Sequence, residues 1–330
     1  MSEIDISIVI VTYNTEQITY NCVQSVLESE TQYTFEVIVV DNNSSDQTVT
    51  RLKADFPSVI VIESQDNLGF SKGNNVGIEK TSGKYILLLN SDTLLFKSSL
   101  EDLLKAAIDK DYKIAGPILL NADHTIQRSW FNFPSALKIF LRLTDIYLLF
   151  YRFSKSVFFR LFYLGKKPAF MVSEISEDTV MEYLTFACIL IKRSVIEEIG
   201  TLDEGLFFYQ EDCEYGLRAK KNNYEFIYSV SSKVVHLGGS SSSKFSVMAF
   251  QNDILGLLHI YKKHYSVEKF KQIKKVIYWA LNFRILFSYV GFYSGLKKSG
   301  LYDKGETAGK QKEQMRDKYI ELRNKVKNYS

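Results

Sequence analysis

The sequence has few of the residues from which disulfide or zinc frameworks are built. It holds three cysteines in 330 residues, and none of them belongs to a CxxC pair. Neither a disulfide framework nor a zinc ribbon is therefore expected. The first residues, MSEIDISIVIVTYN, lack the basic stretch and the apolar run of a cleavable signal and lead directly into a strand pattern. These absences predict a reduced, cytoplasmic protein.

Net charge is also small, at +3, but it is distributed unevenly. Residues 262–330 hold 17 Lys and Arg against 6 Asp and Glu, a net +11, so the preceding 261 residues carry −8. This pattern indicates an acidic body with a basic extension that meets an anionic surface. A membrane leaflet and a nucleic acid are the two candidate surfaces. Because no nucleic-acid-reading motif is present, we expect no nucleic-acid partner.

The chain lacks an uninterrupted apolar run of membrane-spanning length. Residues 276–296 (VIYWALNFRILFSYVGFYSGL) approach it, but Arg284 lies in the middle and adds an insertion penalty of about 2.5–3.5 kcal/mol. Residues 138–167 hold seven Lys and Arg, one acid and nine aromatics. Both segments are typical of helices that lie in the membrane interface, which predicts a peripheral protein at the inner face of the cell membrane. The alternative is helices that pack on the preceding domain or form a homo-oligomer.

Strand and helix patterns alternate through the first 120 residues. β-branched or apolar runs occupy residues 4–12, 35–40, 59–63 and 85–89, with amphipathic helix patterns between them. This spacing predicts a doubly wound α/β domain around a parallel sheet. The hydrophobic content of 46% is enough for one large domain, or for a domain with an extension.

Each of three predicted strands ends in polar residues, and ligands of parallel α/β sheets bind beyond the carboxyl ends of the strands. The three ends read Thr12-Tyr13-Asn14, Asp41-Asn42-Asn43 and Asn90-Ser91-Asp92. We predict that they converge on one pocket. Asp92 could hold Mg²⁺ or Mn²⁺ together with substrate phosphates, or it could cap a turn. Asn14 is also the expected N-cap of the next helix, with Gln17 at the N3 position.

Three further stretches contain candidate functional residues. NLGFSKGNN matches neither the GxGxxG nor the GxxxxGK[ST] phosphate motif, so its expected contribution is a close backbone approach to a ligand plus the side chains of Asn67, Lys72 and Asn74. QEDCEYGLRAK opens a helix with acids, which the helix dipole favours. The apolar residues 206–209 precede these acids, a setting that suits a carboxylate for proton transfer. His236 ends the KVVH strand, where a lone histidine is more often structural than a ligand.

The order of these motifs is more specific than any one of them. VTYN, VVDNNSSD, NLGFSKGNN, LLLNSD, LDEGLFFYQEDCEYGLR and VVHLGGSS follow one another over residues 4–245. This order resembles the family-2 glycosyltransferases of GT-A fold, and among them the bacterial rhamnosyltransferase-type branch that assembles surface polysaccharides or cell-wall linkers. The resemblance implies a Rossmann-like nucleotide-sugar-binding domain at 1–245, with an aromatic and basic insertion at 136–182. A helical, basic extension then occupies 246–330.

The resemblance also implies roles for individual residues. The aspartate after the second strand reads the pyrimidine ring of the donor, which is Asp41 here. The other implied donor contacts are Thr12, Tyr13, Asn14, Asn43, Asn67, Lys72, Asn74 and Ser91. The family's Asp-x-Asp metal motif reads Asn90-Ser91-Asp92, so only its last acid is present, and His236 is the further metal or diphosphate contact. Asp212 is the implied general base beside Glu211, while Trp130 and Arg218 fall where acceptor or sugar contacts are expected.

The implied reaction is an inverting transfer of a sugar from a nucleoside diphosphate to an acceptor hydroxyl on a polysaccharide or a lipid-linked glycan. Negative charge builds on the phosphate oxygens of the leaving diphosphate, and a divalent metal offsets it. The attacking acceptor hydroxyl requires a base to take its proton. A dTDP-rhamnose donor is favoured by the resemblance, with a UDP-sugar as the alternative. A catalytically inactive GT-A domain that binds carbohydrate or membrane is the competing hypothesis, because Asn90 replaces the first metal acid.

Overall fold

The structure is a computed structural model that describes residues 4–144, 175–238, 246–289 and 307–329. Contacts divide the chain into two compact units. Met1–Phe133 and Val172–Ser246 form the first, here called the sheet unit; Pro134–Met171 and Val247–Ser330 form the second, the helical unit. Residues from the expected insertion therefore group with the C-terminal helices. Because contacts alone do not establish which part folds independently, the domain limits given above stay a prediction.

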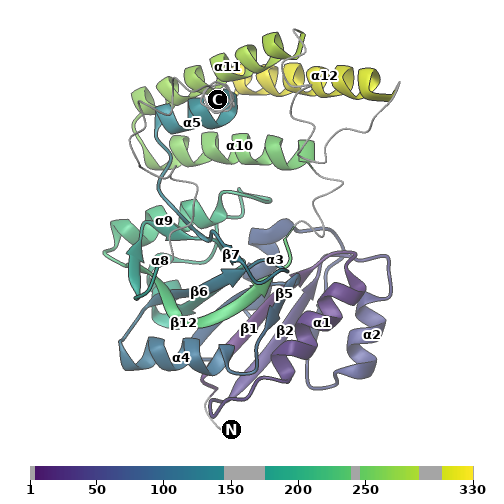
Figure 1. The fold of residues 1–330 in the computed structure, drawn as a ribbon, viewed down its shortest axis with the longest axis vertical. Helices are drawn as coiled ribbons and strands as arrows, with labels where there is room; N and C mark the ends of the chain where they lie inside the picture. The colour runs from purple at the N-terminus through teal and green to yellow at the C-terminus, as the bar shows by residue number, and fades with distance from the viewer. Residues whose placement is uncertain (1–3, 145–174, 239–245, 290–306, 330) are drawn as a thin grey trace, which may run out of the picture. The chain divides into compact units, whose positions relative to one another are not determined.

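The sheet unit contains a mixed sheet of ten strands within the described residues (Figure 1). Its core order is β3-β2-β1-β4-β11-β6-β12-β5, with β7 paired to β6 and β9 paired to β12. The first four strands, which are mutually parallel, are β1 (Ile6–Thr12), β2 (Phe35–Asp41), β3 (Ile60–Glu63) and β4 (Tyr85–Asn90). The others are β5 (Thr93–Leu95), β6 (Ile114–Leu120), β7 (Ile126–Gln127), β9 (Thr179–Met181), β11 (Cys188–Lys192) and β12 (Phe226–His236). The predicted α/β class with a mostly parallel central sheet is confirmed.

Two hydrophobic layers cover the two faces of this sheet because its strands are apolar on both sides. In β1, Ile8 and Ile10 belong to one layer while Val9 belongs to the other, as the twofold side-chain alternation of a strand requires. The first layer packs against α1 (Glu16–Leu27), α2 (Thr48–Asp55) and α4 (Ser99–Asp109). The second packs against α3 (Gly69–Ile78), α8 (Arg193–Ile199) and α9 (Glu211–Lys221). A separate two-stranded sheet pairs β8 (Trp130–Phe131) with β10 (Tyr183–Leu184).

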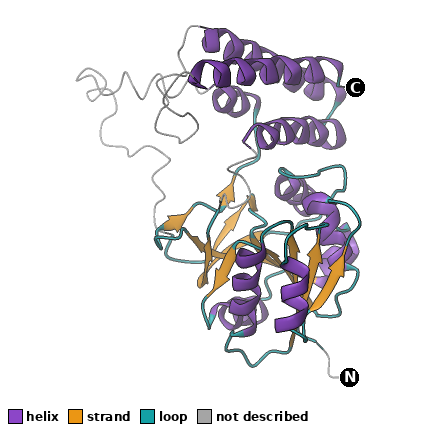
Figure 2. Cartoon of the chain, turned by 90° about the vertical axis from the view of Figure 1, so that its right-hand side faces the viewer, coloured by secondary structure: helices purple, strands orange, loops and turns teal. Residues whose placement is uncertain are grey.

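In the described residues, four helices of the helical unit share an apolar core of their own. Figure 2 shows these helices in purple and the strands of the sheet unit in orange. These are α5 (Ala136–Thr144), α10 (Ser246–His264), α11 (Val267–Tyr289) and α12 (Thr307–Asn328). Arg284, the residue that interrupts the apolar run of the sequence, is directed into this unit. Its guanidinium donates to the Leu143 carbonyl at 3.0 Å and lies 4.8 Å from the Phe250 ring centre.

None of the helices in the described residues is long and apolar enough to cross a membrane. Most of the aromatic and basic segment 138–167, and residues 290–296 of the second segment, lie outside the described residues. Residues 138–144 of the first segment lie in α5, and residues 276–289 of the second lie in α11.

Candidate active site

The strand ends named above meet at one edge of the sheet. The register aligns Thr12 with Asp41, Asp41 with Glu63, and Val11 with Asn90. Neighbouring strands lie about 4.8 Å apart, so the residues that end β1, β2 and β4 are close neighbours. The backbone N–H of Asn42 also donates to the Thr12 carbonyl at 2.9 Å, which extends the β1–β2 pairing into the loops. The edge is therefore lined with polar groups, as the sequence indicates.

Asp41 is the most deeply buried acid at this edge, with 2% of its surface exposed. Its Oδ2 accepts a hydrogen bond from the backbone N–H of Ser44 at 2.8 Å. Its Oδ1 is buried and has no hydrogen-bond partner among the described residues. Buried carboxylate oxygens in folded proteins nearly always have a donor. Oδ1 of Asp41 is therefore positioned to accept a hydrogen bond from a ligand.

The two loops beside Asp41 are joined by hydrogen bonds through Asn14. The side-chain Oδ1 of Asn14 accepts from the backbone N–H of Ser45 at 2.7 Å, and its own N–H donates to Ser44 Oγ at 2.8 Å. Asn14 and Asn43 both have positive φ, of 52° and 64°, and asparagine is the non-glycine residue that tolerates this best. The expectation that Asn14 caps α1 is wrong. Thr15 holds the N-cap position, without a side-chain cap, because the Asn14 side chain is used between the loops.

The glycine-rich stretch lies at the same edge because Asn42 binds it. Asn42 Nδ2 donates to the Gly69 carbonyl at 3.0 Å, and Asn67 Oδ1 accepts from the Gly69 N–H at 3.0 Å. A Cβ at Gly69, where φ is +75°, would lie 2.3 Å from the Phe207 carbonyl oxygen. The backbone of Gly69 therefore lies close to that of Phe207, and its predicted approach to a ligand stays a prediction. The Phe70 N–H donates to that same oxygen at 2.7 Å, so the loop before α9 is held against the start of α3.

The two other predicted donor contacts of this stretch differ in exposure. Lys72 is exposed, whereas Asn74 is 1% exposed and its Nδ2 donates to the Phe70 carbonyl at 2.9 Å within α3. Asn75, which the sequence did not single out, donates to the Leu202 carbonyl at 2.9 Å and accepts from the Leu202 N–H at 2.9 Å. These bonds tie α3 to the chain that leads into α9.

Asp92 and His236 lie together although they are far apart in sequence. β5 pairs with the end of β12, and the Leu237 N–H donates to the Asp92 carbonyl at 2.9 Å. This pairing places His236 Nε2 3.3 Å from Asp92 Oδ1, with both side chains partly exposed. The other ring nitrogen, Nδ1, lies 2.6 Å from Gln127 Oε1. Asn90 Nδ2, in the position of the missing motif acid, is 3.5 Å from Nε2.

These residues fit a divalent cation held jointly with a substrate. No cluster of three or more His, Cys, Asp or Glu side chains suited to a metal occurs among the described residues. The protein would therefore supply Asp92 and His236, and the other coordination positions would belong to phosphate oxygens and water. Mg²⁺ and Mn²⁺ are commonly bound in this way at nucleotide sites.

The acidic pair opens α9 as predicted. Glu211 and Asp212 are its first two residues and are half-buried, and Asp212 Oδ1 accepts from the Cys213 N–H at 2.7 Å. Successive helical residues diverge by about 100° around the axis. The two carboxylates therefore face different directions, and only one of them is aligned with any given substrate group.

Arg218 has partners that fix α9 to the preceding chain. Its Nε donates to both oxygens of Glu214, at 2.9 and 3.1 Å, and Glu214 is fully buried. Its terminal nitrogens donate to the carbonyls of Ile199 at 2.6 Å and Thr201 at 2.7 Å. These bonds assign Arg218 a structural role. Its predicted acceptor contact stays a prediction.

The remaining predicted residues have the following environments. Thr12 is buried and its Oγ1 lies 2.6 Å from Thr19 Oγ1, whereas Tyr13 is exposed. Ser91 is half-buried in the turn between β4 and β5. Trp130 is half-buried and its ring packs edge-on against Tyr228, with 4.9 Å between ring centres. Contacts of these four residues with a ligand stay predictions.

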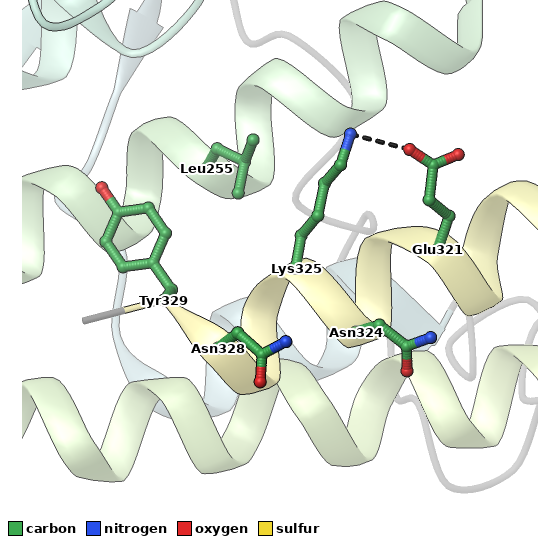
Figure 3. A pocket seen from close by; sticks show the side chains of 6 residues that line it. All are labelled: Leu255, Glu321, Asn324, Lys325, Asn328 and Tyr329. Atoms are coloured by element: carbon green, nitrogen blue, oxygen red, sulfur yellow. Dashed lines mark ion pairs between the residues drawn. The ribbon is translucent and has the colours of Figure 1, made fainter.

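A groove of about 590 Å³ lies in the helical unit and is lined by residues of α10 and α12, with Tyr329 just beyond α12 (Figure 3). Its one carboxylate, Glu321, pairs with Lys325 at 2.8 Å, and this hydrogen bond holds the pKa of Glu321 below its usual value. The other polar lining groups are two asparagines and a tyrosine. Since the one carboxylate of its lining is engaged by Lys325, the groove is not the candidate site.

A parallel α/β sheet whose strands end in polar residues at one edge is typical of enzymes that bind nucleotides beyond the carboxyl ends of the strands. The chain belongs to glycosyl transferase family 2, whose family model matches residues 7–200. Among solved structures it is similar to a mannosyltransferase from Pyrobaculum calidifontis in complex with GDP-Man and Mn²⁺. The TM-score is 0.54 at 14% identity, covering 98% of this chain and 87% of the other. That likeness confirms the GT-A fold.

Three curated relatives are similar over most of their length. The low-salt glycan biosynthesis hexosyltransferase Agl10 of Haloferax volcanii is 27% identical over 78% of this chain and 77% of its own. The dTDP-rhamnosyl transferase RfbF of Shigella flexneri is 27% identical over 72% and 70%. The N-acetylglucosaminyl-diphospho-decaprenol L-rhamnosyltransferase of Mycobacterium tuberculosis is 25% identical over 66% and 71%. The predicted family is confirmed, and these relatives are rhamnosyl- and hexosyltransferases.

Proposed function

We propose that this glycosyltransferase moves rhamnose from dTDP-rhamnose to a hydroxyl of a lipid-linked glycan, with inversion at the anomeric carbon. The observation that carries the donor assignment is the buried Asp41 Oδ1 without a partner among the described residues. A carboxylate oxygen at the end of β2 accepts the N3–H of thymine or uracil. Adenine and the N3 of cytosine offer no donor there, and guanine presents its N1–H on a larger ring.

Rhamnose as the sugar and the lipid-linked acceptor rest on the relatives. One relative is named for dTDP-rhamnosyl transfer and another for rhamnosyl transfer to a diphospho-decaprenol. Asp41 does not distinguish thymine from uracil, so a UDP-hexose is the alternative donor. Transfer from either donor releases a nucleoside diphosphate, so the same metal ligands and the same general base serve both.

Each chain element has a separate task in this proposal. Asp92 and His236 would hold a divalent cation, which would offset the charge that builds on the leaving diphosphate. Asp212 takes the proton of the acceptor hydroxyl as the hydroxyl attacks the anomeric carbon from the face opposite the diphosphate. The hydroxyl oxygen forms the new bond while the bond to the diphosphate breaks, so one displacement inverts the centre and no enzyme nucleophile is needed.

A donor panel tests the function directly. We expect release of dTDP from dTDP-rhamnose, or of UDP from a UDP-hexose, with acceptor and Mn²⁺ present, and loss of release with a chelator. A protein that binds these nucleotides but releases no diphosphate from any donor would be an inactive GT-A module.

The assignment of the base is tested by Asp212→Asn, which keeps the size of the side chain and removes its basicity. We expect sugar transfer to slow by about 10²–10⁴-fold while donor affinity stays within twofold. Glu211→Gln is the matched control, because it makes the same change one residue earlier. If Glu211→Gln abolishes transfer and Asp212→Asn does not, the base is the other member of the pair.

We also propose that the helical unit binds an anionic membrane surface. Lys271, Lys275, Trp279 and Leu286 are exposed on α11, and their spacing places them on one face of the helix. Trp279 is 66% exposed and Leu286 is 61% exposed. Aromatic and apolar side chains beside lysines suit a leaflet of anionic lipid. An isologous dimer through this face would instead bring lysines of both copies together.

Vesicle flotation distinguishes the two occupants of this face. We expect binding to phosphatidylglycerol-containing vesicles that weakens with salt, and reduced binding of Lys271→Glu/Lys275→Glu. Lys80→Glu/Lys233→Glu makes the same charge change at exposed sites of the sheet unit and should bind normally. Binding that is indifferent to lipid charge, or a concentration-dependent dimer broken by Trp279→Ala, would contradict the proposal.

A further inference from the structure

His236 is held by a chain of hydrogen bonds that runs through the hairpin between β6 and β7. Its Nδ1 lies 2.6 Å from Gln127 Oε1. Gln127 Nε2 donates to Asn121 Oδ1 at 3.0 Å and to the His236 carbonyl at 3.2 Å. Asn121 Nδ2 donates to Thr125 Oγ1 at 2.9 Å, and Thr125 Oγ1 donates to Asp123 Oδ1 at 2.6 Å.

The direction of every bond in this chain is determined from its exposed end. Asp123 accepts from both the hydroxyl and the N–H of Thr125, and these bonds hold the pKa of Asp123 below its usual value. An ionised carboxylate only accepts, so the Thr125 hydroxyl must donate to it and accept from Asn121. The Asn121 oxygen then faces Gln127, whose NH₂ group has two oxygen partners. The Gln127 oxygen is therefore the end that faces His236.

An imidazole nitrogen that faces an amide oxygen must be the protonated one. In the neutral ring the other nitrogen then carries the lone pair. That nitrogen is Nε2, which lies on the Asp92 side. Asp92 Oδ1 at 3.3 Å would favour the opposite tautomer, with the proton on Nε2, but the contact to Gln127 is shorter by several tenths of an ångström. The shorter bond favours Nδ1–H.

We propose that Gln127 is a positioning residue that fixes His236 in the Nδ1–H tautomer and so presents the Nε2 lone pair beside Asp92. The use of that lone pair for a divalent cation rests on the proposed function. The tautomer itself does not. The second partners of metal-binding histidines commonly act in this way, and their loss lowers metal affinity by about 10–100-fold. Here the partner is itself oriented by three further side chains: Asn121, Thr125 and Asp123.

Nitrogen NMR of the metal-free, nucleotide-free protein reads the tautomer. The chain has four histidines, so ¹⁵N-histidine labelling gives a simple spectrum, and His236→Asn identifies the signal of interest. At a pH where the ring is neutral, we expect Nδ1–H in the wild type. Gln127→Leu should shift it to Nε2–H, because Asp92 is then the remaining acceptor in contact with the ring. Gln127→Glu restores an acceptor and should retain Nδ1–H.

The consequence is measured as Mn²⁺ affinity in the presence of dTDP, by EPR. Gln127→Leu should weaken it about 10–100-fold, whereas Gln24→Leu, the same change at an exposed position of α1, should not. If Gln127→Leu fails to fold, the exposed Thr125→Val variant provides a second test. It should show a mixture of the Nδ1–H and Nε2–H tautomers of His236. A wild-type Nε2–H tautomer, or retention of Nδ1–H in Gln127→Leu, overturns the inference. If the tautomers behave as stated but neither Mn²⁺ nor dTDP binds, the proposed function fails and the hydrogen-bond chain stands.

Discussion

Replacing Asp41 by asparagine converts its buried acceptor into a donor with almost no change in shape. The asparagine oxygen can still accept from the Ser44 N–H, as Asp41 Oδ2 does at 2.8 Å. The NH₂ group then occupies the position of Oδ1, which has no partner among the described residues. If that position faces the N3–H of thymine, two donors meet in the variant. The fold should survive while nucleotide recognition fails.

The expected loss is that of one hydrogen bond to a charged group, roughly 1.5–3 kcal/mol, or about 10- to 150-fold in Kd. Isothermal titration of dTDP, UDP, CDP and GDP at fixed Mn²⁺ measures it. The wild type should bind dTDP and UDP in preference to CDP, because cytosine has no N3–H. In Asp41→Asn this preference should shrink, since the new NH₂ group can donate to the N3 of cytosine.

Asp55→Asn is the control, because it makes the same exchange at an exposed acid near the end of α2 and should leave all four affinities unchanged. Equal binding of dTDP and CDP by the wild type would refute the proposed role of Asp41. So would a folded Asp41→Asn variant that binds dTDP within twofold of the wild type.

Three further predictions concern the metal pair, α9 and a buried thiol. Asp92→Asn should weaken Mn²⁺-dependent donor binding more than metal-free nucleotide binding, and titrations with and without a chelator compare the two. Glu214→Gln leaves the Arg218 guanidinium without its buried counter-charge, so it should lower the free energy of unfolding by about 3–5 kcal/mol, as read by urea denaturation. Burial raises the pKa of the Cys22 thiol to about 12, so iodoacetamide should alkylate Cys22 at pH 8 only after unfolding. Alkylation of the native protein at the unfolded rate would contradict this.

The strand-end site could be predicted from the sequence because it depends on local patterns. An apolar run that stops at Asp41, and another that stops before Asn90 and Asp92, indicate two neighbouring carboxyl ends of a parallel sheet. The register then brings Asp41 beside Thr12. His236 was placed near the metal acid only through the resemblance, because its contact with Asp92 depends on antiparallel pairing of β12 with β5. No local pattern encodes that pairing.

Side-chain partners contributed by distant segments could not be predicted. Glu214 and Arg218 are four residues apart on a helix, a spacing that permits the ion pair of the structure. The sequence does not show that the terminal nitrogens of Arg218 donate to the carbonyls of Ile199 and Thr201. Gln127 gives no signal at all, because a single amide in a short hairpin is unremarkable until the fold brings His236 within 2.6 Å.

Backbone strain marks the same edge of the sheet independently of any side-chain chemistry. The described residues include seven non-glycine positions with positive φ, and four of them, Asn14, Asn43, Tyr209 and Gln210, lie in the loops of the candidate site. This conformation costs an L-residue about 1–2 kcal/mol, and less for asparagine. Tyr209 and Gln210 are consecutive and directly precede Glu211, so the turn into α9 is the costliest of these.

Strain of this kind persists only where surrounding contacts hold it. Here the Phe207 carbonyl binds the start of α3 and the Gln210 carbonyl accepts from the Glu214 N–H at 2.9 Å. Glycine at these two positions would remove the strain but would raise the entropy of the unfolded chain. In the proposed function, this turn sets the direction in which Glu211 and Asp212 leave the start of α9.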